Sequence, residues 1–186
     1  MPTEILTGLW LGSKTDAYDE DFIVKKNITN ILNCTKTVSF PPFYETMRGL
    51  KYYRLPIDDQ PDNYKNEREQ QQMYSKLNMI TDYIHTALSS EQSILVHCYA
   101  GKQRSAAVIA AYMMKYGKIG MHISIDYIKA KKPTCFSPMI NFEYALQQFE
   151  TDLKHGNSNS NSSNNNNGHK NNGHSNIHHN RHSKRY

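Results

Sequence analysis

The sequence ILVHCYAGKQRS, residues 94–105, decides how the chain around it folds. It opens on three consecutive apolar residues, Ile94-Leu95-Val96, a pattern typical of a central parallel strand buried on both faces. The alanine-rich, mostly apolar stretch 105–116 follows and predicts a buried helix that ends at Gly117. A strand, a short loop and a helix in this order put the loop at the carboxyl edge of a sheet, where α/β proteins bind ligands.

Working outward, short apolar segments alternate with helical patterns. Strand character is found in residues 9–11, 28–33, 52–57 and 93–97. Apolar residues spaced by three and four predict helices around residues 73–88, 119–130 and 142–153. We therefore expect an α/β domain, with a central and mostly parallel sheet covered by helices on both faces.

The composition changes at residue 155. Residues 155–186 consist largely of Asn, Ser, Gly and His, with Ile177 as the single aliphatic residue. Such a segment buries too little apolar surface to offset the conformational entropy lost on ordering. We therefore expect one folded domain at residues 1–154 and a disordered tail at residues 155–186. The dense but irregularly spaced tail histidines do not predict a defined metal site.

Most of the net charge lies in this tail. It carries +4 of the formal +5, which leaves the first 154 residues near neutral at +1. Weak attraction to nucleic acid or another polyanion is one interpretation, but a solvated extension is favoured, and nucleic acid is not an expected partner.

The chain has three cysteines, at positions 34, 98 and 135, with no CxxC pair. This pattern favours a reducing compartment over a disulfide-stapled secreted domain. The first residues lack a basic segment followed by an apolar one, and no apolar run approaches the ~18–20 residues that span a bilayer. We expect a soluble, intracellular protein that needs no membrane.

The loop after the 93–97 strand carries the candidate chemistry. Backbone N–H groups and the start of the next helix favour a bound phosphate there, and they favour Cys98 as a thiolate nucleophile. Arg104, six residues later, can bond two phosphoryl oxygens at once, and Gly101 permits a tight backbone. Neither Cys34 nor Cys135 has an arginine at this spacing. The competing interpretation of Cys98 is a small buried hydrophobe at a strand end.

The motif His97-Cys98-x-x-Gly101-x-x-Arg104-Ser105 resembles the signature loop of the cysteine-dependent protein phosphatases, in particular their dual-specificity branch. Residues 5–13, 28–33, 111–114 and 133–149 are also similar to that branch, so the resemblance covers about residues 4–150. The family often has Ser or Gly at the position of Gln103, and Asn at the position of Met139. These departures bear on substrate preference, since the reaction requires neither group. The resemblance is to the small, atypical type, and since we see no docking or rhodanese-like segment before the catalytic part, the sequence does not predict a particular partner protein.

The resemblance implies a role for each site residue. Cys98 is the nucleophile, Asp59 the general acid, Ser105 an aid to thiolate release and His97 an orienting group. Asp58 is the rival of Asp59 for the acid. The phosphate is bound by residues of the phosphate loop (residues 98–104), namely Tyr99, Ala100, Gly101, Lys102, Gln103 and Arg104, while Asn33 braces this loop. No metal or cofactor is expected.

The same resemblance implies activity on phosphotyrosine and phosphoserine or phosphothreonine of proteins. A non-protein substrate, either an inositol lipid or an RNA 5′-phosphate, stays open because Lys102 and the basic tail suit polyanions. A non-catalytic phosphate-binding module is the third alternative. The position of Cys34 beside Asn33 also suggests a protective disulfide with Cys98 under oxidation, although a packed thiol is the simpler interpretation. The sequence leaves the oligomeric state open.

Overall fold

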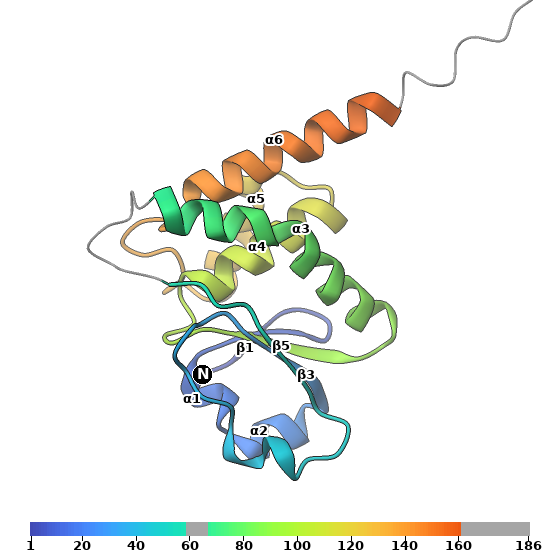
Figure 1. The fold of residues 1–186 in the computed structure, drawn as a ribbon, viewed down its shortest axis with the longest axis vertical. Helices are drawn as coiled ribbons and strands as arrows, with labels where there is room; N and C mark the ends of the chain where they lie inside the picture. Colours follow the sequence, from blue (N-terminus) through green and yellow to red (C-terminus); the bar gives the residue numbers. More distant parts are fainter. Residues whose placement is uncertain (59–66, 161–186) are drawn as a thin grey trace, which may run out of the picture.

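A computed structural model describes residues 1–58 and 67–160, with side chains through Gly156. Its centre is a five-stranded sheet in the order β1-β2-β5-β3-β4 (Figure 1). The strands are β1 (Thr3–Leu6), β2 (Leu9–Gly12), β3 (Ile28–Asn33), β4 (Lys51–Arg54) and β5 (Ser93–His97). The expected α/β architecture, with a mostly parallel sheet, is confirmed.

Strand β5 lies between β2 and β3 and is parallel to both. In this register Val96 pairs with Leu11 of β2 and with Leu32 of β3. Its consecutive apolar residues pack on opposite faces of the sheet. Ile94 and Val96 belong to one core cluster, whereas Leu95 belongs to the other. This is the two-sided burial that the sequence predicts for a central strand.

Two edges of the sheet differ from the sequence-based expectation. Strand β1 is a separate antiparallel edge strand, joined to β2 by a turn at Gly8. Strand β4 covers Lys51–Arg54, whereas residues 52–57 were expected to be extended. The strand ends before Leu55-Pro56 because proline has no N–H to donate to a ladder.

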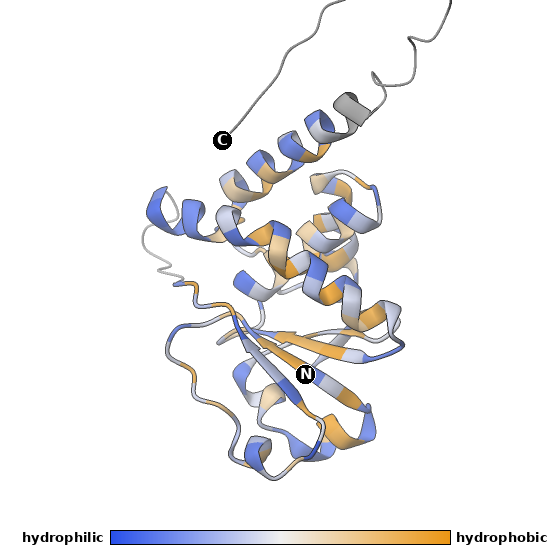
Figure 2. Ribbon diagram, turned by 45° about the vertical axis from the view of Figure 1, so that its right-hand side comes forward, coloured by the Kyte–Doolittle hydropathy of each residue, from blue (hydrophilic) through white to orange (hydrophobic). Residues whose placement is uncertain are grey.

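Four long helices cover one face of the sheet and form the larger core. They are α3 (Glu67–Ser89), α4 (Arg104–Tyr116), α5 (Met121–Lys131) and α6 (Glu143–Ser160). Helix α4 lies against β5 and is buried on nearly every side, as its composition predicts. In Figure 2 hydrophobic (orange) segments lie along the strands and on the helices next to the sheet, and buried residues of α3–α6 form one cluster with Ile94 and Val96 of β5.

The opposite face is covered by shorter elements. Helices α1 (Lys14–Ala17) and α2 (Glu20–Lys25) and the 3-10 helix η1 (Pro42–Glu45) surround a smaller cluster built on Trp10, Ile31 and Leu95. In Figure 1 α1 and α2 lie below the sheet and α3–α6 above it, so helices on both faces are confirmed.

Helix α6 continues past the boundary predicted from composition. The predicted domain ends at residue 154, but the helix runs to Ser160. Residues 161–186, most of the expected tail, lie outside the described residues, so the domain boundary stays a prediction. Within residues 1–58 and 67–160, no helix is both long and apolar enough to cross a bilayer.

Candidate active site

The phosphate loop begins where β5 ends at His97 and stops where α4 begins at Arg104. It therefore lies at the carboxyl edge of the parallel strands. The loop closes over a pocket of about 440 Å³ that Cys98, Lys102 and Arg104 help to line. Tyr99 stands 65% exposed at the rim, whereas Cys98 is 1% exposed at the base.

The sulfur of Cys98 is surrounded by donors. It accepts hydrogen bonds from the Gly101 N–H at 3.2 Å and from the Ser105 hydroxyl at 3.3 Å. Burial by itself raises the pKa of Cys98. The charge of Arg104 and the hydrogen bonds from Ser105 and from the Lys102 backbone outweigh burial, so the pKa is lowered. These contacts favour the thiolate, which is the nucleophilic form.

Arg104 connects the phosphate loop to the chain that follows β4. Its Nη1 donates to the Ile57 carbonyl at 3.2 Å. Ile57 is fully buried, which fixes the position of this carbonyl. The guanidinium therefore stands beside the loop at a fixed place, where its planar fork can meet an anion held by the loop amides.

His97 lies beneath the loop and is 0% exposed. Its Nδ1 is 3.4 Å from the Cys98 carbonyl, and its Nε2 is 3.4 Å from the Tyr52 hydroxyl. Burial lowers the pKa of His97 to about 4, with the charge of Arg54 as a lesser contribution in the same direction. The ring is therefore neutral near pH 7, which suits an orienting role better than a proton-transfer role.

The side chain of Asn33 is connected to the phosphate loop through intermediate residues. Its amide donates to Tyr52 at 2.8 Å and to the Val38 carbonyl at 3.0 Å, and it accepts from the Thr35 hydroxyl at 2.7 Å. Tyr52 in turn contacts His97. This chain of contacts is compatible with a bracing role, which stays a prediction.

The turn between β2 and α1 supports the loop from behind, and the sequence did not indicate it. The Lys14 N–H donates to the Tyr99 carbonyl at 3.0 Å. Gly101 has φ +66°, and a Cβ there would lie 2.5 Å from the Gly12 carbonyl oxygen. A capping box between Ser13 and Asp16 holds the turn. Only the Ser-x-x-Asp spacing could have signalled this support.

A second missed support comes from residues 135–141. The Phe136 N–H donates to the Lys102 carbonyl at 3.0 Å, and the Cys135 thiol lies 3.6 Å from the Gly101 carbonyl. Gln103 bonds the backbone of Met139 and Asn141. These residues are more than 30 positions from the loop in the sequence, so no local pattern could reveal the contacts.

The two candidate acids, Asp58 and Asp59, are adjacent in the sequence, after Ile57. Asp59 lies outside the described residues. Asp58 is described, and its carboxylate pairs with the ammonium of Lys36, with both side chains partly exposed. The choice between these carboxylates stays a prediction.

All three cysteines of the chain are free thiols in the structure. Cys34 and Cys135 are buried, and burial raises the pKa of each, to about 11 for Cys135. Cys98 alone has a lowered pKa. The disulfide between Cys34 and Cys98 stays a prediction. Among the described residues, no group of three or more His, Cys, Asp or Glu side chains could hold a metal ion.

Comparison with known proteins agrees with this geometry. A family profile described as "Dual specificity phosphatase, catalytic domain" matches residues 9–152. Dual specificity protein phosphatase 9 of Homo sapiens is 33% identical over 82% of this chain, and dual specificity protein phosphatase 22 of Xenopus laevis is 32% identical over 78%. The matched region spans 37% and 63% of these two relatives.

A crystal structure of human DUSP28 superposes with a TM-score of 0.69 at 22% identity. The match covers 82% of this chain and 95% of that one. At this identity the likeness shows the fold alone.

Proposed function

The chain belongs to the dual-specificity phosphatase family, and from this membership we propose that it hydrolyses phosphate monoesters on tyrosine, serine and threonine residues of proteins. The observation that carries the proposal is the environment of Cys98. A buried sulfur with a lowered pKa lies at the base of a loop that Arg104 closes. A phosphate-binding module without turnover needs no such sulfur.

In the first step, the Cys98 thiolate attacks phosphorus in line with the leaving oxygen. An S–P bond forms as the P–O bond to the substrate breaks. The loop amides and Arg104 hold the remaining phosphoryl oxygens, where charge develops. The residues of the loop, 99–103, are the proposed backbone donors.

A general acid must protonate the departing oxygen, and we assign this role to Asp59. The support is its place in the sequence, two residues after Ile57, whose carbonyl accepts from Arg104. Two residues span at most about 7 Å, so the chain passes close to the phosphate-binding arginine just before Asp59. Asp58, paired with Lys36, is the weaker candidate.

In the second step, ionised Asp59 takes a proton from water, which attacks the cysteinyl phosphate. The S–P bond breaks, inorganic phosphate is released and Cys98 returns as a thiolate. Ser105 stabilises the returning charge, because its hydroxyl already donates to the sulfur. His97 and Asn33 hold the loop in place.

The test is hydrolysis of a small aryl phosphate by the full chain, without added metal, over a pH series. We expect Cys98→Ser to abolish turnover. We expect Asp59→Asn to lower kcat about 10²–10³-fold and to flatten the basic limb of the profile. Asp58→Asn is the matched control and keeps most of the activity. Turnover by the Cys98→Ser variant would contradict the proposed mechanism. A wild-type chain that binds phosphate without hydrolysing the aryl phosphate would indicate a non-catalytic binding module.

Substrate competition then tests the proposed class. Phosphotyrosine and phosphothreonine peptides should outcompete an inositol phosphate lipid and an RNA 5′-triphosphate as inhibitors of aryl phosphate hydrolysis. A strong preference for the lipid or the RNA would overturn the assignment to protein substrates. The three free thiols fit a reducing compartment, where we propose that the enzyme acts.

A further inference from the structure

Gln103, the residue before Arg104, uses both ends of its side-chain amide. Its Nε2 donates to the Met139 carbonyl at 2.8 Å, and its Oε1 accepts from the Asn141 N–H at 3.2 Å. The residue is 8% exposed. The buried side-chain amide of Gln103 therefore hydrogen-bonds the backbone of residues 139–141 through both its N–H and its oxygen. These two bonds hold residues 139–141 in a fixed position relative to the backbone of Gln103.

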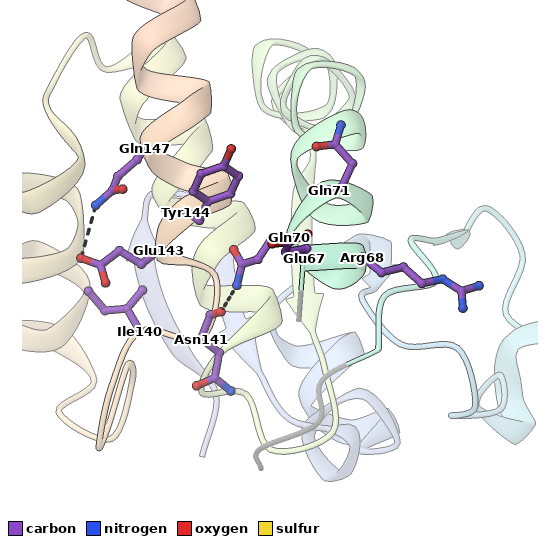
Figure 3. A pocket seen from close by; sticks show the side chains of 9 residues that line it. All are labelled: Glu67, Arg68, Gln70, Gln71, Ile140, Asn141, Glu143, Tyr144 and Gln147. Atoms are coloured by element: carbon purple, nitrogen blue, oxygen red, sulfur yellow. Dashed lines mark hydrogen bonds between the residues drawn. The ribbon is translucent and has the colours of Figure 1, made fainter. Parts of the chain in front are cut away.

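The bound stretch, residues 139–141, forms a ridge between two hollows. Met139 and Asn141 line the catalytic pocket that holds Cys98. Ile140 and Asn141 line a second cavity of about 810 Å³ between the starts of α3 and α6 (Figure 3). The Met139 side chain is 42% exposed, so it stands as an apolar wall beside the pocket.

A second glutamine holds the other side of the ridge. Gln70, in the first turns of α3, donates through Nε2 to the Asn141 carbonyl, as Figure 3 shows, and accepts from the Ala145 N–H at 3.0 Å. Gln70 is also buried, at 6% exposed. The ridge is thus anchored to the body of the domain by Gln70 and to the phosphate loop by Gln103.

We infer that Gln103 is a positioning residue for substrate selection, which ties the Met139 wall to the phosphate loop so that a phosphorylated protein segment meets the wall and Cys98 at a fixed separation. The inference rests on the proposed function. A small aryl phosphate needs the loop but makes little use of the ridge. A phosphopeptide extends over the rim, and its binding depends on where the ridge stands.

The size of residue 103 is what permits this link. A serine at this position has one hydroxyl on a short stem and cannot replace both amide hydrogen bonds. Gln103→Ser therefore releases the ridge from the phosphate loop, while Gln70 still holds it to α3.

The test compares kcat/KM for a phosphotyrosine peptide with kcat/KM for a small aryl phosphate. Gln103→Ser lowers both, and we expect the peptide value to fall about tenfold more, chiefly through KM. Met139→Ala lowers the peptide-to-aryl ratio in the wild-type background. In the Gln103→Ser background, Met139→Ala adds little, because the wall is no longer tied to the phosphate loop. Gln103→Glu keeps the length of the side chain and the oxygen that accepts from the Asn141 N–H, but it loses the N–H that donates to the Met139 carbonyl. Should Gln103→Ser fold poorly, Gln103→Glu should show the same larger loss of kcat/KM for the peptide than for the aryl phosphate.

The matched control is Gln92→Ser. Gln92 precedes β5, at the opposite end of that strand from Cys98, and its side chain also makes a hydrogen bond, from Asn30 at 2.9 Å. It should leave the peptide-to-aryl ratio unchanged. Equal losses on the two substrates in Gln103→Ser and Gln103→Glu, or additive effects of Gln103→Ser and Met139→Ala, would overturn the inference.

Peptide binding to the Cys98→Ser protein, measured by titration with and without Gln103→Ser, tests the ridge without turnover. A larger loss of affinity for the peptide than for inorganic phosphate supports the inference, and equal losses for the two ligands reject it. A wild type without turnover would refute the proposed function, and the titration would still decide the role of Gln103.

Discussion

Ser105 stands at the junction of the phosphate loop and α4, where its hydroxyl donates to the Cys98 sulfur at 3.3 Å. The hydrogen bond stabilises the thiolate, so Ser105→Ala should raise the pKa of Cys98. The measurement is the pH dependence of Cys98 alkylation by iodoacetamide, followed by peptide mass spectrometry, and its midpoint should move to higher pH.

The matched control for Ser105 is Ser124→Ala. Ser124 is equally buried, but its hydroxyl bonds the Gly120 carbonyl within α5. We expect the alkylation midpoint to stay where it is in this variant. A midpoint that Ser105→Ala leaves unmoved would mean that Arg104 and the backbone donors suffice to hold the thiolate.

His97 links the site to the pH dependence of folding. Its pKa falls from an ordinary 6.5 to about 4 because it is buried. Between these values the unfolded chain binds a proton that the folded chain does not, so stability is present above pH 6.5 and is lost as pH falls toward 4. The shift corresponds to about 3 kcal/mol.

His97→Gln should therefore weaken this acid sensitivity. Urea unfolding from pH 4 to 7 measures it, and the wild type should lose about 3 kcal/mol more than the variant over this range. The variant is less stable at pH 7, since the contacts with Tyr52 and the Cys98 carbonyl are lost. Parallel curves for the two proteins would contradict the assignment of a buried neutral ring.

At the scale of elements, the phosphate loop is packed directly against the β2–α1 turn. Gly101 has φ +66°, and a Cβ at this position would meet the Gly12 carbonyl oxygen at 2.5 Å. Gly49 has a comparable φ of +86° with nothing within 4 Å of a Cβ. The two glycines thus separate the cost of the left-handed backbone from the cost of the close approach.

Gly49→Ala should destabilise the fold by about 1 kcal/mol, the cost of the backbone conformation alone. Gly101→Ala should cost more than this and should remove most aryl phosphate hydrolysis, because the loop must shift away from β2. Chemical denaturation and kcat/KM measure the two effects. Similar stability and full activity in both variants would show that the loop accommodates the methyl group.

The sequence predicted the long elements and the loop between β5 and α4. Apolar residues spaced by three and four mark α3, α5 and α6, the alanine-rich apolar stretch marks α4, and the run Ile94-Leu95-Val96 marks β5. It missed β1, α1 and α2, which have four to six residues and show no repeat. The contacts of Gln103 with Met139 and of Gly101 with Gly12 join distant segments. They follow from the tertiary packing and have no local signature.

At the scale of the molecule, the two faces of the sheet contribute differently to the site. The β2–α1 turn supports the phosphate loop from the smaller core, whereas residues 135–141, themselves held by Gln70 of α3, support it from the larger one. Arg104 also contacts the segment after β4. Because these supports come from separate parts of the chain, the site forms only when the whole domain is folded.

The last prediction concerns the extent of that domain. Phe149 is 3% exposed and Leu153 packs against the same core, while Glu150 accepts from the Met121 N–H at 2.8 Å. These contacts tie α6 to α5 and to the core, and residues 161–186 contain a single aliphatic residue, Ile177, that could extend them. The folded, catalytic unit should therefore need α6 and should not need residues 161–186.

Two truncations test this extent. A chain ending at residue 160 should keep its Tm within about 2 °C and its kcat/KM for aryl phosphate, because it keeps the contacts of Phe149, Glu150 and Leu153. A chain ending at residue 147 loses Phe149 and Leu153 and should be destabilised by about 3–5 kcal/mol or more, as for truncation of a buried aromatic residue. Removal of residues 161–186 also removes +4 of the formal +5 charge. The 160-residue chain should therefore elute from a cation exchanger earlier than the full chain. If the 160-residue chain lost its activity with an unchanged Tm, residues 161–186 would have to act at the site directly.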